Sequence, residues 1–450
     1  MTRISSLVAL IGLTLLFWTG PVEAQQTGPS AAPLTTVQSH ALAPIGSAAA
    51  FDPVKATNAY LARVSGKERT RSDSYFEGKY WLLLVDALWA IAASAALLFT
   101  RVSAQIRDFA ERQTRSRFWS VTLYVGPFFL VMTALTFPLT LYEDYLREKA
   151  YGLMNQTFLG WFGEFLTLTG VNLIVSLVAL TILYWVIRLA KGNWWIWGTI
   201  VFAVFATILT IAEPVLIDPL TNTYTPLPQS QIKDDILSLA RANGIPAKNV
   251  YLVDASKQSD RISANVGGFL GTTRVALNDN LLHKGTHDEI LAVLGHEMGH
   301  YVLDHAVFGL ALQTLLAFFV LALVSAGFEL AVSLFGGNWD VRRIEDPAGL
   351  PVLYAVLTIV LLLATPISNT ITRTVEIQAD MFGINAVRKP DAFSTVVLKL
   401  SNYRKLDPAP WEEMVFYDHP SGRTRIWEMM RWKAEHLNDP DIKAGATSPQ

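Results

Sequence analysis

The residues with the clearest chemistry form the segment His-Glu-Met-Gly-His at positions 296–300. On a helix, positions i and i+4 lie on one face, so the imidazoles of His296 and His300 can bind the same metal ion. Zinc suits this pair, because imidazole is among its usual ligands and a catalytic zinc keeps one position open for water. Glu297 follows the first histidine, where its carboxylate can hold that water and take its proton.

A catalytic zinc site needs a third protein ligand. No histidine follows His300 at the spacing of the extended metzincin motif. The best candidate is Glu376, in the segment Val-Glu-Ile-Gln-Ala-Asp at 375–380. We expect Glu376 to bind zinc, and Asp380, on the same helix face, to hydrogen-bond a ligand histidine and fix its tautomer. The pattern alone is equally compatible with a solvated acidic face.

The composition indicates that much of the chain lies in a membrane. Apolar residues make up 51% of the 450 residues and charged residues only 16%, compared with about 25% charged in an average soluble domain. The net charge of -2 gives no indication of nucleic acid binding. The chain has no cysteine, which excludes disulfides, thiolate metal ligands and a cysteine nucleophile.

Long apolar stretches supply the candidate membrane spans, each of which needs about 20 helical residues. Six of them lie at roughly 80–100, 118–141, 160–187, 194–217, 305–335 and 350–369. Tryptophan and tyrosine cluster at several of their ends, as at a lipid–water boundary. A further apolar run, 5–20, makes residues 1–24 either a signal peptide or a first transmembrane span. The expected fold is therefore mainly α, with six or seven spans.

The polar stretches between the spans define the remaining parts of the chain. Residues 218–304 read as a small zincin-like α/β metalloprotease unit, with helices at 231–243 and 286–303 and strands at 250–253 and 274–277. The expected division of the chain is 1–24, a linker and lead-in at 25–78, membrane spans at 79–217, the metalloprotease segment at 218–304, two spans at 305–370, and a C-terminal helical catalytic segment at 371–450.

Together these motifs make the sequence resemble the M48 family of metalloproteases, specifically its integral-membrane CAAX prenyl protease (Ste24-like) branch. The resemblance rests on His-Glu-x-Gly-His at 296–300, Glu-x-x-Ala-Asp at 376–380, and the Asp-Pro-Leu to Thr-Pro-Leu segment at 218–227. Residues near the second span of the family also match: Ser72, Tyr75, Lys79 and Tyr80. The resemblance implies that Glu376 is the third zinc ligand, that 1–24 is a span, and that the spans enclose an intramembrane chamber.

Two further site regions are implied by the same resemblance. The family places an asparagine on a strand beside the substrate, and Asn265 is its counterpart, although the neighbouring residues depart from the family pattern. An edge strand there would bind substrate by β-augmentation. The family also has a His-Pro-x-x-x-x-Arg pattern, matched by His419 and Arg425. His419 would donate to the oxyanion of the tetrahedral intermediate, and Arg425 would order the acidic residues. A structural histidine before Pro420 is the alternative.

The function expected from these features is a zinc-dependent endopeptidase in a membrane, with one zinc per chain and peptide or protein substrates. One version removes the C-terminal tripeptide of prenylated CAAX proteins, and the other is quality control of membrane proteins. The alternative is a non-enzymatic metal-binding transporter or scaffold. A transporter should carry ionisable residues in several spans. Here Asp86, Glu164 and Glu213 are the visible cases, which are too few to favour it.

Basic residues between the spans suggest an orientation. They gather in the loops at 101–117, 188–193 and 336–349, which fall on one side of the membrane if the spans alternate. By the positive-inside rule that side is cytoplasmic. The catalytic segments would then face the periplasm from a bacterial inner membrane. The resemblance implies the opposite orientation, since the eukaryotic members have their zinc site on the cytosolic side.

Overall fold

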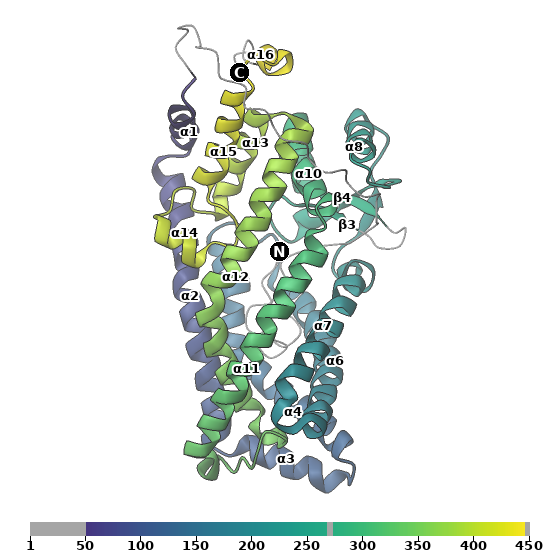
Figure 1. Ribbon diagram of the computed structural model, residues 1–450, viewed down its shortest axis with the longest axis vertical. Coiled ribbons are helices and arrows are strands. Elements are labelled where there is room, and N and C mark those ends of the chain that lie inside the picture. Colours follow the sequence, from purple (N-terminus) through teal and green to yellow (C-terminus); the bar gives the residue numbers. More distant parts are fainter. Residues whose placement is uncertain (1–50, 268–272, 446–450) are drawn as a thin grey trace, which may run out of the picture.

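The computed structural model describes residues 51–267 and 273–445. The expected signal peptide or first span at 1–24, and residues 25–50 of the expected linker, lie outside the described residues. Long helices run the length of the molecule, and α3 (Val102–Gln113) crosses its lower end in Figure 1. The metal-motif helix α10 (His287–Val302) and the small sheet lie toward the opposite end.

The multi-span helical fold is confirmed. Within the described residues, five helical segments are long and apolar enough to cross a membrane: Gly66–Phe99, Arg117–Ala150, Phe158–Leu220, His305–Trp339 and Pro347–Val387. The third contains two helices that pack together, α6 (Phe158–Ala190) and α7 (Trp194–Ala212). All six expected stretches are therefore helical, in α2 (Gly66–Phe99), α4 (Arg117–Leu141), α6, α7, α11 (His305–Trp339) and α12 (Leu350–Val387).

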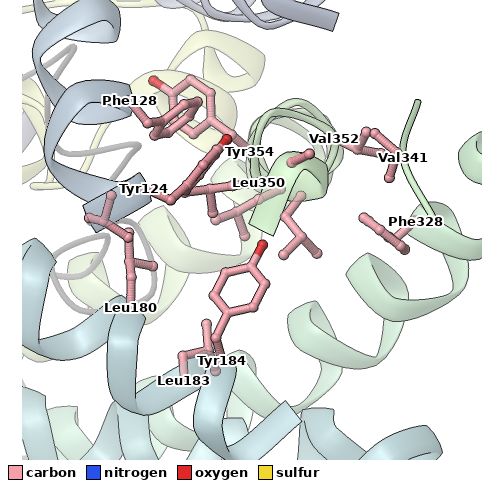
Figure 2. Close-up of a cluster of buried hydrophobic side chains, with 14 of the residues drawn as sticks. Tyr124, Phe128, Leu180, Leu183, Tyr184, Phe328, Val341, Leu350, Val352 and Tyr354 are labelled. Atoms are coloured by element: carbon pink, nitrogen blue, oxygen red, sulfur yellow. The ribbon is translucent and has the colours of Figure 1, made fainter. Parts of the chain in front are cut away.

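The tight core of the bundle is concentrated in its lower half. Figure 2 shows Tyr124 and Phe128 of α4 beside Tyr184 of α6 and Tyr354 of α12, all of them buried. Toward the upper half of the bundle the packing of α12 becomes sparse, because this helix buries no residue between Leu357 and Glu376. Hydrophobic burial thus holds the helices together at the end remote from the motif.

A buried arginine ties the lower end together. Arg107 of α3 is 1% exposed, and its guanidinium lies 2.8 Å from an oxygen of Asp108, 2.8 Å from Asp340 and 2.9 Å from Asp346. The expected basic loops meet here, since Arg101 Nε donates to the Asn338 carbonyl at 3.0 Å. In the remaining basic loop, 188–193, the Arg188 side chain donates to the Arg117 carbonyl at 2.6 Å. The three loops therefore lie at one end of the bundle, opposite the motif.

The α/β unit contains a four-stranded sheet in the order β1-β2-β4-β3. The expected strands β2 (Val250–Val253) and β4 (Arg274–Asn278) are confirmed and pair in parallel. β3 (Ala264–Gly267) runs antiparallel to β4 at one edge, where the resemblance implies a strand. The short strand β1 (Tyr224–Pro226) was not expected. Around the sheet lie the expected helix α8 (Gln231–Ala242), the short α9 (Asp279–Lys284) and α10.

Helices also form most of the described chain ends. The lead-in expected before residue 79 is mostly helical where it is described, as α1 (Pro53–Leu61) and the first turns of α2. Polar contacts explain this extension, since the Ser72 hydroxyl donates to the Arg404 carbonyl at 3.0 Å. The C-terminal helices are α13 (Pro390–Lys399), α14 (Pro410–Phe416), α15 (Gly422–Glu435) and α16 (Pro440–Gly445). No break separates the last span from the Glu376 segment, because both belong to α12.

Candidate metal centre

Local sequence signals fix the start of α10. Thr286 is its N-cap and forms a capping box with Glu289, whose carboxylate accepts from the Thr286 amide at 2.7 Å. One face of the helix is buried against the sheet through Leu294 and Met298, both 0% exposed. The histidines of the motif then project from the other side, toward α12.

Glycines allow α10 and α12 to cross with their backbones close together. A Cβ atom added to Gly383 of α12 would lie 2.7 Å from the backbone nitrogen of His296. One added to Gly299 would lie 3.1 Å from the Cα of Ala379. Side chains at these positions would push the helices apart. Gly299 of the His-Glu-Met-Gly-His segment therefore allows the close packing of α10 against α12.

Three candidate ligands converge between these helices. The Nε2 atoms of His296 and His300 are 3.1 Å apart. Glu376 Oε2 lies 3.3 Å from His296 Nε2, and Glu376 Oε1 lies 3.6 Å from His300 Nε2. Bonds of about 2.0–2.1 Å in a tetrahedral zinc site place neighbouring ligand atoms about 3.3 Å apart. The separations of these donor atoms therefore fit zinc.

A buried carboxylate oxygen without a hydrogen bond also indicates that a cation can bind in this cluster. Glu376 Oε2 is buried and has no hydrogen-bond partner of good geometry among the described residues. A buried carboxylate oxygen without a partner is costly, since it has lost its water and gained nothing in return. A metal ion between the three side chains would satisfy this oxygen together with the two imidazole nitrogens.

An ionic pair behind His296 orients its ring. Asp380 Oδ1 lies 2.7 Å from His296 Nδ1, and Arg425 donates to both oxygens of Asp380, at 2.7 and 2.5 Å. With its Nδ1–H donated to Asp380, His296 presents the lone pair of Nε2 toward Glu376. Asp380 thus contacts a candidate ligand histidine, and Arg425 contacts Asp380.

The site controls the charge of its three motif side chains. Burial lowers the pKa of His296, but the hydrogen bond and charge of Asp380 outweigh it and raise the pKa to about 10. Burial, together with the charge on His296, lowers the pKa of His300 to about 3. The carboxylates around His296 therefore favour a cation at its Nε2, either a proton or a metal ion, and burial keeps His300 neutral. Burial raises the pKa of Glu297 to about 7, which suits a group that both takes and returns a proton near neutral pH.

The other two predicted residues lie in different relations to this cluster. His419 is brought to it, with Nε2 3.4 Å from Glu376 Oε1 and Nδ1 3.0 Å from Asp418 Oδ1. Asn265 is on the edge strand β3, which packs against α10. Its side-chain oxygen is buried and has no hydrogen-bond partner among the described residues.

The structure adds two residues that the sequence analysis missed. His305 Nδ1 lies 3.1 Å from His300 Nδ1, and His305 Nε2 lies 3.1 Å from Gln378 Oε1. Gln378 was visible within the segment at 375–380, and His305 follows the motif by five residues. Neither spacing indicates a contact if the chain continues as one helix, so neither residue was singled out.

Comparisons with known proteins cover nearly all the described chain. A family model described as peptidase family M48 matches residues 226–433, and one described as CAAX prenyl protease N-terminal, five membrane helices, matches 55–223. A Bacillus subtilis protein named as an uncharacterized metalloprotease is 28% identical over 85% of this chain and 90% of its own length. The Oryza sativa subsp. japonica CAAX prenyl protease 1 homolog is 26% identical, over 79% of this chain and 86% of the relative.

A solved structure shares the fold. The crystal structure of S. mikatae Ste24p superposes with a TM-score of 0.70 at 20% identity, covering 84% of this chain and 95% of that chain. The agreement extends through both the helical bundle and the metal-motif segment, since so little of either chain is left out.

Proposed function

Because this chain is a membrane metalloprotease of peptidase family M48, we propose that it is a zinc-dependent endopeptidase with one zinc held by His296, His300 and Glu376. The observation that carries the proposal is the convergence of these three side chains, whose candidate ligand atoms all lie within 4.8 Å of one another. The alternative of a metal-binding transporter or scaffold is disfavoured, because both family matches are to proteases.

The side chains around the proposed ligands have different roles in peptide hydrolysis. Zinc bound there supplies a Lewis acid that polarises the scissile carbonyl and lowers the pKa of a water. Glu297 takes a proton from the attacking water and gives it to the leaving amine nitrogen. His419 donates a hydrogen bond from Nε2 to the oxygen that becomes negative in the transition state. Asp380 and Arg425 hold His296 in one tautomer and one orientation.

The substrate we propose is a peptide segment of a membrane-bound chain, with CAAX-type C-terminal processing as its specific form. Relatives named as CAAX prenyl proteases support this class. The edge strand β3 offers unpaired backbone groups for an extended peptide, and Asn265 lies on it. The sparsely packed part of α12 is apolar at 359–364, which would suit a lipid-modified chain, whereas the residues at 368–374, nearer the metal site, are mostly polar.

We also propose an orientation for the site. The chain is an integral membrane protein, and its basic loops gather at the end of the bundle opposite the metal cluster. If that end is cytoplasmic, as the positive-inside rule states, the site faces the periplasm of a bacterial inner membrane. Alkaline phosphatase fused after residue 440 should then be active. Fluorescence from a cytoplasm-only reporter at the same point would show the reverse orientation.

The enzymatic proposal is tested on the purified full chain. Elemental analysis should give about one zinc per chain, and chelation should abolish cleavage of a prenylated C-terminal peptide. Full activity after exhaustive chelation would refute the zinc mechanism. Mass spectrometry of peptides retained by Glu297→Gln tests the substrate class: prenylated C-terminal segments are expected, and internal segments of membrane proteins would indicate quality control instead.

A further inference from the structure

His305 is a buried histidine that none of the steps above uses. It is the first residue of α11, it is 3% exposed, and it follows Asp304, whose left-handed backbone (φ 51°) separates α10 from α11. Its ring lies between His300 on α10 and Gln378 on α12. One imidazole therefore contacts side chains from both helices that carry the proposed ligands.

Which atom donates in each of the two hydrogen bonds of His305 follows from the chemistry of Gln378. Gln378 Oε1 can only accept, so His305 Nε2 carries the hydrogen and donates across 3.1 Å. The Nδ1 of a neutral His305 is then an acceptor, and it lies 3.1 Å from His300 Nδ1. His300 must donate its Nδ1–H there, which leaves the lone pair of its Nε2 directed at the metal cluster.

On the premise that His300 binds zinc as proposed above, we propose that His305 is the residue that positions this ligand. It fixes the tautomer and ring orientation of His300 by accepting the Nδ1–H, and Gln378 holds His305 in turn. The arrangement parallels that of His296, Asp380 and Arg425, with one difference. Asp380 brings a negative charge to its histidine, whereas His305 orients His300 without adding charge.

The test measures the dissociation constant for Zn²⁺ of the full chain in detergent, by competition with a chromophoric chelator. His305→Ala should weaken zinc binding about 10–100-fold, as for other partners of metal-bound histidines. His305→Asn should restore much of it, because Asn Oδ1, like His Nδ1, is two bonds from Cβ and can accept from His300. His305→Gln should not, because its amide extends to the position of Nε2.

A matched control is His287→Ala, which removes a half-exposed histidine of α10 that pairs with Asp235 at 3.0 Å. Its zinc affinity should equal that of the native chain. The thermal midpoint of each metal-free variant is measured as well, because a purely structural role would lower it to the same extent in Asn, Gln and Ala.

Three outcomes would overturn the inference. Zinc binding by His305→Ala as tight as that of the native chain would show that His300 needs no partner. Asn and Gln variants of equal zinc affinity would show that accepting at the Nδ1 position has no effect. Loss of zinc that simply follows loss of stability in the metal-free protein would assign His305 to packing. A native chain that binds no zinc would instead refute the proposed function, which is a distinguishable result.

Discussion

Both ends of the helical bundle bury a cluster of charged side chains, but the two clusters differ in what completes them. At the lower end, Arg107 provides the positive charge, and Asp346 also accepts from the amides of Arg342 and Ala348, each at 3.0 Å. At the upper end, two imidazole nitrogens lie 3.1 Å apart and Glu376 Oε2 has no hydrogen-bond partner of good geometry among the described residues. The lower cluster is satisfied by the chain itself, whereas the side chains of the upper one fit a cation.

The difference shows how a binding site can be separated from a structural ion cluster. Both contain at least one buried carboxylate and a buried arginine, so residue types alone do not distinguish them. What distinguishes them is the matching of donors and acceptors, because a native protein seldom leaves a buried polar atom unpaired without a reason. Variants of the upper cluster should therefore change activity and metal binding, and variants of the lower cluster should change stability.

The largest expected effect is on turnover. Glu297→Gln keeps the size of the side chain but cannot accept a proton, so kcat should fall about 10²–10⁴-fold. Zinc content should stay at the native level, because Glu297 is assigned as base and not as ligand. Steady-state kinetics and elemental analysis of the same preparation test both. Loss of zinc in this variant would mean that the roles within the upper cluster are assigned wrongly.

Substitutions in the lower cluster should lower stability and leave zinc binding unchanged. Arg107→Met leaves the buried Asp346 without its counterion and should lower the free energy of unfolding by about 3 kcal/mol. The two amides that still donate to Asp346 limit the loss. Denaturant titration measures the change, while the zinc dissociation constant should stay at the native value. A large loss of zinc affinity would contradict the independence of the two ends.

An intermediate effect is expected at Asp380. Asp380→Asn keeps the packing but removes the charge behind His296, so the zinc dissociation constant should rise about 10-fold. Chelator competition measures this. If zinc affinity is unchanged while stability falls sharply, the pair formed by Asp380 and Arg425 belongs with the structural cluster at the lower end.

The crossing of α10 and α12 should be sensitive to a single methyl group. Gly383→Ala places a Cβ 2.7 Å from the backbone nitrogen of His296 and should cost about 1–3 kcal/mol of stability, with weaker zinc binding. Gly337→Ala in α11 is the control, since its Cβ meets nothing within 4 Å. Thermal unfolding with and without zinc should show an effect for Gly383 alone.

The smallest effect is a pH dependence at the start of α10. Burial raises the pKa of Glu289, but Lys399, 2.5 Å away, and the Thr286 amide outweigh it and hold the pKa below its ordinary value. A lowered pKa in the folded state adds stability above the unfolded pKa of about 4.3. That stability is lost as the pH falls through the folded value.

Glu289→Gln should consequently be about 1 kcal/mol less stable than the native chain at pH 7. The two should converge as the pH falls below about 4. Thermal midpoints measured across this range test the expectation, and a constant difference at all pH values would contradict it.

Helical spacing predicts the contact partners that lie on regular helices and misses those that depend on a turn. His296 and His300 share a face because they are four residues apart, and Glu376 and Asp380 do so for the same reason. His305, five residues beyond His300, would point elsewhere on a continuous helix. The left-handed residue Asp304 redirects the chain and brings the two rings together, which no periodicity reveals.

Long-range pairing explains the other differences. Arg107 counts as a basic loop residue in the sequence, but the structure shows it buried with Asp346, 239 residues away. The strand β1 has only three residues and exists through its pairing with β2, so its own sequence is too short to indicate it. The spans were predictable because a run of about twenty apolar residues indicates a membrane helix by itself, whatever the run packs against.

The continuity of α12 gives the enzyme a mechanical property. About 26 residues separate Leu350 at the lower end from Glu376, a rise of about 39 Å at 1.5 Å per residue. A tilt of about 5° about that lower end would move Glu376 sideways by roughly 3 Å, comparable to the separation of the ligand atoms. Spans tilt to match the hydrocarbon thickness around them. Glu376, the proposed third ligand, therefore lies on a helix whose tilt depends on the surrounding bilayer, and we expect the activity of this protease to vary with lipid chain length.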